Sequence, residues 1–226
     1  MYLFTNMVGR KMVMSISGLA MVLFVILHLL GNTSIFAGPD GINAYAMMLR
    51  GLTPFLWIMR LVMFTAVCLH AFFGVRLSLE NHYARPEAYA VKKNIRSTFT
   101  GRNMIWTGAF IASYLVFHLL HFTLHVISPG LSAGGHGHMD ELGRPDVYLM
   151  VVSSFRHFTV SVIYISAMAA LALHLYHGIQ SLFQTLGLNT EKTLHFFVRA
   201  GAVAAIILSL GFISIPLGIF AGIVRH

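Results

Sequence analysis

The stretch that decides the fold is residues 11–36, KMVMSISGLAMVLFVILHLLGNTSIF, in which Lys11 and His28 are the only ionisable side chains. An apolar run of this length can cross a hydrocarbon core of about 30 Å as a helix. The run is much longer than the apolar stretch of a signal peptide, which has about 7–15 residues. We therefore expect a retained first membrane helix.

Four similar runs follow, so we expect spans at about 11–36, 54–80, 103–128, 156–184 and 193–224. The composition agrees, because 57% of the residues are hydrophobic and only 10% are charged, whereas soluble domains carry about 25% charged residues. The sequence thus predicts an all-α integral membrane protein. Residues 1–226 would form a single transmembrane domain, a bundle of five helices in a lipid bilayer.

The formal charge of +8 favours the membrane rather than nucleic acid as a partner, because the basic residues gather at the ends of the spans. With a cytoplasmic N-terminus, ten of the fifteen lysines and arginines fall on the inner face. This bias predicts that orientation. The single cysteine, Cys68, excludes a disulfide framework and covalent haem attachment within the chain.

The thirteen histidines are the candidate functional residues, because an ionisable group at membrane depth is costly and usually functional. The deep ones are His28, His70, His118, His121, His125, His174 and His177. At about 1.5 Å per residue, His28 lies about 7 Å past the middle of its span toward the outer face, and His118 about 4 Å past it on that side. His70 and His174 lie about 4–6 Å past the middle toward the cytoplasm.

Depth therefore predicts an outer and an inner histidine pair, although it does not choose between His118 and its neighbours His121 and His125, or between His174 and His177. Two imidazoles facing each other fill both axial positions of a haem iron, which favours one-electron transfer. Small residues lie one turn before and after His70 and His174, where they would leave room for a porphyrin or allow close helix packing. They are Ala66, Gly74, Ala170 and Gly178. We therefore expect a cytochrome b with two non-covalent haems b.

Four segments in order along the chain carry a family resemblance: SGLAMVLFVILHLLGN, HAFFGVRLSLENHYARP, TGAFIASYLVFHLLHF and LHLYHGIQSLFQTLGL. Together they resemble the single-chain, two-haem cytochrome b subunit of succinate:quinone oxidoreductases, including menaquinol:fumarate reductases. In that family the first ligand lies ten residues after a glycine and the third ten residues after Thr-Gly. The fourth ligand precedes a glycine by four residues. The resemblance thus implies His28, His70, His118 and His174 as metal ligands, pairing the first with the third and the second with the fourth.

The resemblance also implies a function in the bacterial cytoplasmic membrane. The chain would be the membrane subunit of the enzyme and would carry its quinone chemistry, passing electrons between menaquinone and an iron–sulfur subunit. That subunit, with a flavoprotein beyond it, would dock on the cytoplasmic face, where the basic segment 85–102 lies. Some fumarate reductases of the family have a proton-transferring Glu two residues before the fourth ligand. Here that position is Ala172, which puts this proton route in doubt.

A haem near the outer face is needed only if electrons must reach a quinone there. We therefore expect menaquinone near the outer ends of the first two spans, where Asn32, Tyr45 and Arg50 are the nearest polar candidates. Asn32 could instead only cap its helix, and Arg50 could only anchor at the headgroups. Ser15, which resembles a position that touches the inner haem in relatives, and His157, at the outer face, are candidate haem contacts.

Other functions remain open at this stage. The main alternative is a haem b subunit of another quinone-linked dehydrogenase or hydrogenase. A metal transporter is suggested by thirteen methionines and thirteen histidines, but methionine is also common in apolar cores. A scaffold bundle with satisfied histidines is a third alternative.

Overall fold

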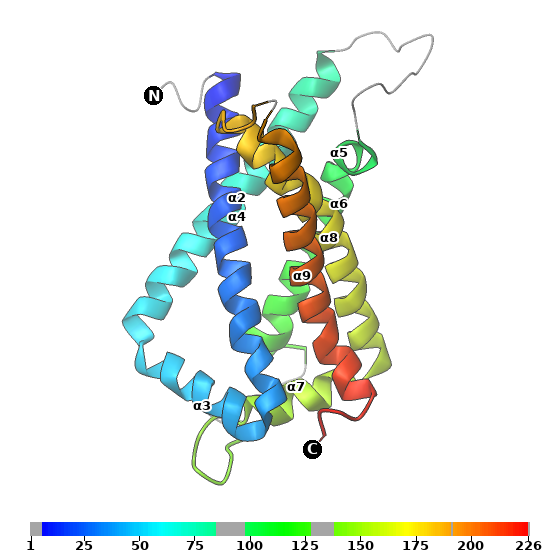
Figure 1. The fold of residues 1–226 in the computed structure, drawn as a ribbon. Helices are drawn as coiled ribbons and strands as arrows, with labels where there is room; N and C mark the ends of the chain where they lie inside the picture. The colour runs from blue at the N-terminus through cyan, green and yellow to red at the C-terminus, as the bar shows by residue number, and fades with distance from the viewer. Residues whose placement is uncertain (1–5, 85–97, 128–137, 191, 226) are drawn as a thin grey trace. The chain divides into compact units, whose positions relative to one another are not determined.

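The computed structural model describes residues 6–84, 98–127, 138–190 and 192–225, and these parts of the chain are almost entirely helical (Figure 1). Five helices are long and apolar enough to cross a membrane, which confirms the predicted all-helical, multi-pass class. They are α2 (Met7–Asn32), α4 (Thr53–Tyr83), α6 (Met104–His118) together with the π-helix η2 (Leu119–Thr123), α8 (Phe158–Thr185) and α9 (Leu194–Phe220). Only helices of this kind satisfy their own backbone hydrogen bonds in lipid.

Two further helices, α3 (Gly38–Gly51) and α7 (Val147–Arg156), lie in segments that the sequence predicted only as connections. Both are too short to cross a bilayer. α3 begins with Pro39 and Asp40 in its first turn and ends with Arg50 in its last turn, as helix capping and the helix dipole favour. At the start of α7 the Asp146 carboxylate accepts a hydrogen bond from the Leu149 N–H at 2.9 Å.

The ends of the long helices also differ from the predicted spans. α2 ends at Asn32, and the 3-10 helix η1 (Thr33–Ala37) leads into α3. A short helix, α5 (Phe99–Arg102), precedes α6, and α6 continues as a π-helix, η2 (Leu119–Thr123). Single π turns within helices are rare and often lie at functional sites.

The chain forms two compact units, to which each of the five long helices contributes. The first unit consists of the described residues within 1–24, 60–109 and 172–206. The second consists of those within 25–59, 110–171 and 207–226. One predicted histidine pair falls within each unit, His70 with His174 in the first and His28 with His118 in the second.

In the first unit, α4 buries one stripe that includes Ala66, Phe73 and Leu77. Glu80 follows one turn later, where its Oε2 lies 2.9 Å from Nη2 of Arg10 on α2 and its Oε1 lies 3.1 Å from Nε of Arg76. Arg10 is nearly buried. This partly buried ion pair links α2 to α4 within the unit.

The second unit contains the main apolar core, built on η1, α3, α7, α8 and the end of α9. Its buried members are Ile35, Ile42, Tyr148, Met150, Val151, Val152, Phe155, Tyr164, Ile215, Ile219 and Val224. Fully buried Asn43 fixes α3 to the segment before α7, because its Nδ2 donates to Asp140 and Asp146, both at 3.2 Å. Its Oδ1 accepts from the Tyr148 N–H at 2.9 Å.

Candidate functional site

The inner pair is His70 on α4 and His174 on α8, whose ring centroids lie 6.2 Å apart within the first unit. A bond from a histidine nitrogen to a metal such as zinc is about 2 Å long, so two imidazoles on opposite sides of one metal have centroids roughly 6 Å apart. Ordinary aromatic pairs also occur at about 4.5–7 Å. The separation alone therefore does not distinguish a metal site from an ordinary ring contact. The hydrogen bonds of the two rings provide the further evidence.

The ring of His70 is oriented by the backbone of the neighbouring helix. Its Nδ1 lies 3.0 Å from the carbonyl oxygen of Met14 on α2. A carbonyl can only accept a hydrogen bond, so Nδ1 must carry the proton and donate it. In a neutral imidazole this leaves the lone pair on Nε2, the nitrogen that a metal would bind.

His174 is held in the same tautomer by a side chain. Its Nδ1 lies 3.1 Å from Oγ1 of Thr107 on α6. The Thr107 hydroxyl is 3.2 Å from the carbonyl of Asn103 and 3.1 Å from that of Met104, either of which can take its proton. The hydroxyl can then accept from His174 Nδ1, and within the described chain no hydrogen bond reaches Nε2 of His70 or His174.

Two glycines allow these rings to lie against the neighbouring helices. A Cβ atom at Gly18 would come within 3.2 Å of His70 Cε1, and one at Gly108 within 3.4 Å of His174 Cε1. By contrast, a Cβ at Gly74 or Gly178 would meet nothing within 4 Å, so space is open beside both helices there. Gly18 and Gly108 are the glycines that precede His28 and His118 by ten residues. Each of these glycines therefore lies on the same helix as a histidine of the outer pair but contacts a histidine of the inner pair.

The outer pair is His28 on α2 and His118 at the end of α6, with ring centroids 6.0 Å apart within the second unit. Its polar neighbours are side chains. Asn32 Nδ2 lies 3.3 Å from His28 Nδ1 and donates to the His28 carbonyl at 2.7 Å. The Tyr164 hydroxyl lies 3.3 Å from His118 Nδ1. Both rings are partly exposed.

The competing histidines are placed differently. His121 is only 2% exposed, and its ring stacks on Phe122 with centroids 4.1 Å apart. The ring of His177 lies against Gly101, where a Cβ would come within 2.8 Å. His125 follows the π-helix in a left-handed conformation, with φ 54°. The geometry favours His118 and His174 as the paired members of their clusters.

Of the three quinone-site candidates, two lie beside the outer pair. Asn32 is one turn from His28, and the Tyr45 ring lies so close to Gly31 that a Cβ there would be 2.5 Å from its hydroxyl. Arg50 is exposed in the last turn of α3. The structure therefore gathers Asn32 and Tyr45 near His28, and Arg50 lies farther along α3.

The two predicted haem contacts, Ser15 and His157, belong to different units of the chain. Ser15 is buried on α2 in the first unit, next to Met14. His157 is an exposed residue at the end of α7 in the second unit, where its backbone N–H donates to the Ser154 carbonyl at 3.2 Å. Most of the basic segment expected to receive a partner, residues 85–97, lies outside the described residues.

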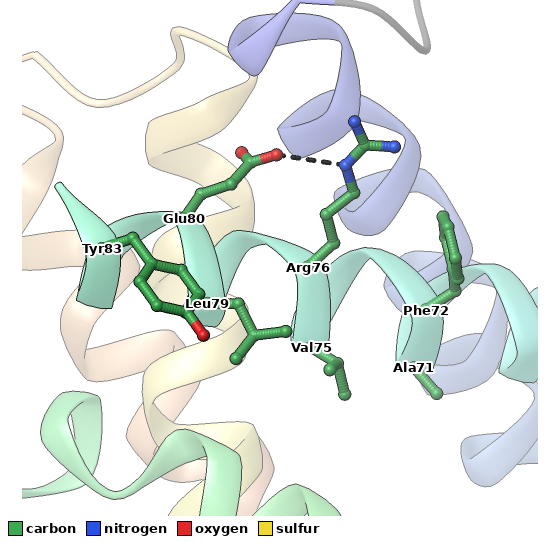
Figure 2. A pocket seen from close by; sticks show the side chains of 7 residues that line it. All are labelled: Ala71, Phe72, Val75, Arg76, Leu79, Glu80 and Tyr83. Carbon is green, nitrogen blue, oxygen red and sulfur yellow. Dashed lines mark hydrogen bonds and ion pairs between the residues drawn. The ribbon is translucent and has the colours of Figure 1, made fainter.

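A hollow of about 590 Å³ runs along the face of α4 shown in Figure 2. It is lined by Ala71, Phe72, Val75, Arg76, Leu79, Glu80 and Tyr83. The Arg76–Glu80 ion pair is its charged feature, and neither inner histidine lines it. A ligand site needs polar groups that converge from several elements. A surface along a single membrane helix is suited to contact with lipid acyl chains, so we assign no ligand and no reaction to this hollow.

Tyr164 is a site residue that the sequence analysis missed, yet a signal for it exists. It precedes His174 by ten residues, as Gly18 precedes His28 and Gly108 precedes His118. In all three cases the residue ten positions before a paired histidine contacts a histidine of the other pair. The same spacing thus marks helix-to-helix contacts at three of the four paired histidines.

Paired histidines suit a metal whose remaining positions are filled by a macrocycle. A bare ion such as zinc normally takes three or four protein ligands. Among the residues that the structure describes, no group of three or more histidine, cysteine or acidic side chains could hold a metal ion. Bis-histidine haem iron needs two protein ligands, and each pair offers two imidazoles.

Fold and site together define a multi-pass, all-helical membrane protein with two histidine pairs between its long helices. No known family model matches the chain. No curated protein and no solved structure matches it either.

Proposed function

We propose that the chain is the membrane anchor and electron-transfer subunit of a succinate:quinone oxidoreductase or menaquinol:fumarate reductase in a bacterial cytoplasmic membrane. It would bind two non-covalent haems b, one between His28 and His118 and one between His70 and His174. The observation that carries the proposal is the inner pair. Its centroids are 6.2 Å apart and both Nδ1 atoms are engaged, so both Nε2 lone pairs remain for a metal.

A haem held by two histidines would supply one-electron transfer rather than oxygen binding. The protein contributes orientation. The Met14 carbonyl and the Thr107 hydroxyl fix the ring tautomers, and such outer partners usually raise ligand basicity. Gly18 and Gly108 allow the rings to approach the neighbouring helices. The open space beside Gly74 and Gly178 fits a flat macrocycle next to the inner pair.

The partners are proposed from the sequence resemblance. An iron–sulfur subunit would dock on the cytoplasmic face and exchange electrons with the inner haem, and a flavoprotein would lie beyond it. Menaquinone would bind near the outer haem. Support for that site comes from Asn32 and Tyr45, which lie beside His28 and can hydrogen-bond a quinone carbonyl.

The decisive experiment is haem analysis of the purified chain. Pyridine haemochrome assay should give two haems b per chain, and a redox titration should resolve two one-electron components. A colourless protein would contradict the proposal and favour the metal-transporter alternative.

A second experiment tests the reaction. The intact complex, purified from native membranes, should contain an iron–sulfur protein and a flavoprotein and should interconvert succinate and fumarate with menaquinone analogues. A complex that contains haem but carries different catalytic partners would identify another quinone-linked dehydrogenase or a hydrogenase.

A further inference from the structure

The Tyr164 hydroxyl on α8 is shared by two histidines of the second unit. It lies 3.3 Å from Nδ1 of His118 and 3.1 Å from Nδ1 of His121. Tyr164 is 6% exposed and His121 is 2% exposed. Buried polar groups are held in defined hydrogen bonds, because an unpaired one is costly.

One hydroxyl has one proton, so it cannot donate to both rings. If His118 binds a metal through Nε2, its Nδ1 must carry a proton and donate it to the Tyr164 oxygen. The Tyr164 proton is then available to His121 Nδ1, 3.1 Å away, which can accept it. In this arrangement His118 donates to Tyr164, and Tyr164 donates to His121.

The opposite direction would give His118 the wrong tautomer. If Tyr164 donated to His118 Nδ1, the neutral His118 ring would carry its proton on Nε2, and its lone pair would be unavailable there. When Tyr164 donates to His121 Nδ1, its oxygen can accept from His118 Nδ1, and of the two rings only His118 then presents its Nε2 lone pair. Because His121 is buried and stacked on Phe122, it is suited to the accepting end.

We infer that Tyr164 and His121 are positioning residues for the outer haem, which hold His118 in its metal-binding tautomer and thereby set the potential of that haem. This inference rests on the proposed function. A hydrogen bond from the ligand's Nδ1 raises its basicity and favours the ferric iron. Removing the hydroxyl should therefore raise the potential of the outer haem.

The test is equilibrium redox titration of the purified haem-loaded chain, with low-spin electron paramagnetic resonance as a second readout. Tyr164→Phe should retain two haems and shift the ferric-to-ferrous equilibrium of one haem roughly tenfold toward ferrous, since outer partners change affinity by about 10–100-fold. For a one-electron couple this is about 59 mV upward. The shifted haem should be the one that remains in a His70→Ala background.

Tyr114→Phe is the matched control. Tyr114 lies in the same aromatic cluster, with its ring 5.1 Å from that of Tyr164 and 5.9 Å from that of His118. No hydrogen bond joins its hydroxyl to a histidine among the described residues. This variant should match the wild type in both readouts.

His121 gives an independent pair of variants if Tyr164→Phe fails to fold. His121→Leu removes the acceptor and should shift the same haem upward, whereas His121→Asn can accept from Tyr164 and should restore the wild-type potential. Selective loss of the outer haem in Tyr164→Phe but not in Tyr114→Phe would also support the inference.

Two haems with unchanged potentials and spectra in Tyr164→Phe would overturn the inference and leave the proposed function intact. If Tyr164→Phe does not fold, equal potentials in His121→Leu and His121→Asn would overturn it. A wild-type chain without haem would instead overturn the proposed function.

Discussion

The inner and outer histidine pairs have similar ring separations, 6.2 Å and 6.0 Å, but their Nδ1 atoms are held differently. In the inner pair, His70 bonds to a backbone carbonyl and His174 to a hydroxyl that can pass its proton to a helix carbonyl. In the outer pair, His118 shares the Tyr164 hydroxyl with His121, and His28 is near the Asn32 amide. The inner tautomers are thus set by a main-chain carbonyl and by a hydroxyl that is itself bonded to the main chain, whereas the polar partners of the outer rings are side chains.

This difference shows where substitutions can tune each site. A carbonyl cannot be removed by a side-chain substitution, so the inner pair should resist change except through Thr107. The outer pair depends on side chains whose replacement leaves the backbone intact. The experiments below test or refine this contrast, in order of decreasing expected effect.

The largest effect is expected from removing an inner ligand. His174→Ala should lower haem content from two to one per chain by pyridine haemochrome assay, because the remaining axial ligand, His70, cannot hold the haem alone. His177→Ala is the matched control, one turn away, and should retain both haems. If His177→Ala lost a haem and His174→Ala did not, the inner pair would be wrongly assigned.

The next effect concerns Gly18. Although Gly18 shares a helix with His28, Gly18→Val should weaken the inner haem, because even a Cβ added there would lie 3.2 Å from the His70 ring. Overpacking of this kind costs about 1–3 kcal/mol, which corresponds to roughly fivefold to 140-fold in haem retention. Haem content should be measured during dilution into haem-free detergent.

Gly201→Val provides the control for that experiment. A Cβ at Gly201 would lie 3.3 Å from Ile179, so the helix packing is equally tight but no histidine is involved. Equal haem loss in the two variants would show that Gly18 acts through general helix packing rather than through His70.

A smaller effect is expected at Thr107. Thr107→Val has a similar shape but removes the group that accepts from His174 Nδ1, so the inner haem should shift in potential with little loss of haem. We expect a shift of about 59 mV, which is roughly tenfold for one electron, upward as for Tyr164→Phe. Thr107→Ser should keep the wild-type potential. If the potential of the outer haem shifted instead, the proposed difference between the two pairs would be wrong.

The smallest effect is expected in residues 138–148 of the second unit, which are hydrogen-bonded to Asn43 of α3. Partial burial favours neutral Asp140, but hydrogen bonds from Arg144 and Asn43 outweigh this and hold the pKa of Asp140 below its ordinary 3.8. A lowered pKa stabilises the fold above the unfolded value, and this contribution is lost as the pH falls through the folded pKa. Amide-exchange protection of residues 138–148 should therefore hold down to about pH 4 and decline below it.

Asp140→Asn separates this titration from other acid effects. The variant should show weaker protection at neutral pH, because the charge-assisted contacts with Arg144 at 2.7 Å are weakened. It should also lose the decline below about pH 4. A decline of the same size in Asp140→Asn would assign the acid response to another group.

Much of the fold could be predicted from the sequence because membrane helices are local structures. A run of about 20 apolar residues must form a helix in lipid, whatever its neighbours do. The depth of each histidine follows from its position in such a run, so an outer and an inner pair could be predicted before the contacts were known. The choice of His118 and His174 within their clusters came from the family resemblance. Short α3 and α7 carry no such signal.

The contacts between helices were decided only by the tertiary structure. Residues 56 positions apart, Met14 and His70, or 46 apart, His118 and Tyr164, meet because of how helices pack, which composition and periodicity do not encode. The sequence by itself determined a five-span helical protein with histidines at two depths. Only the tertiary structure decided which nitrogen His70 and His174 present, because that choice depends on an acceptor on another helix.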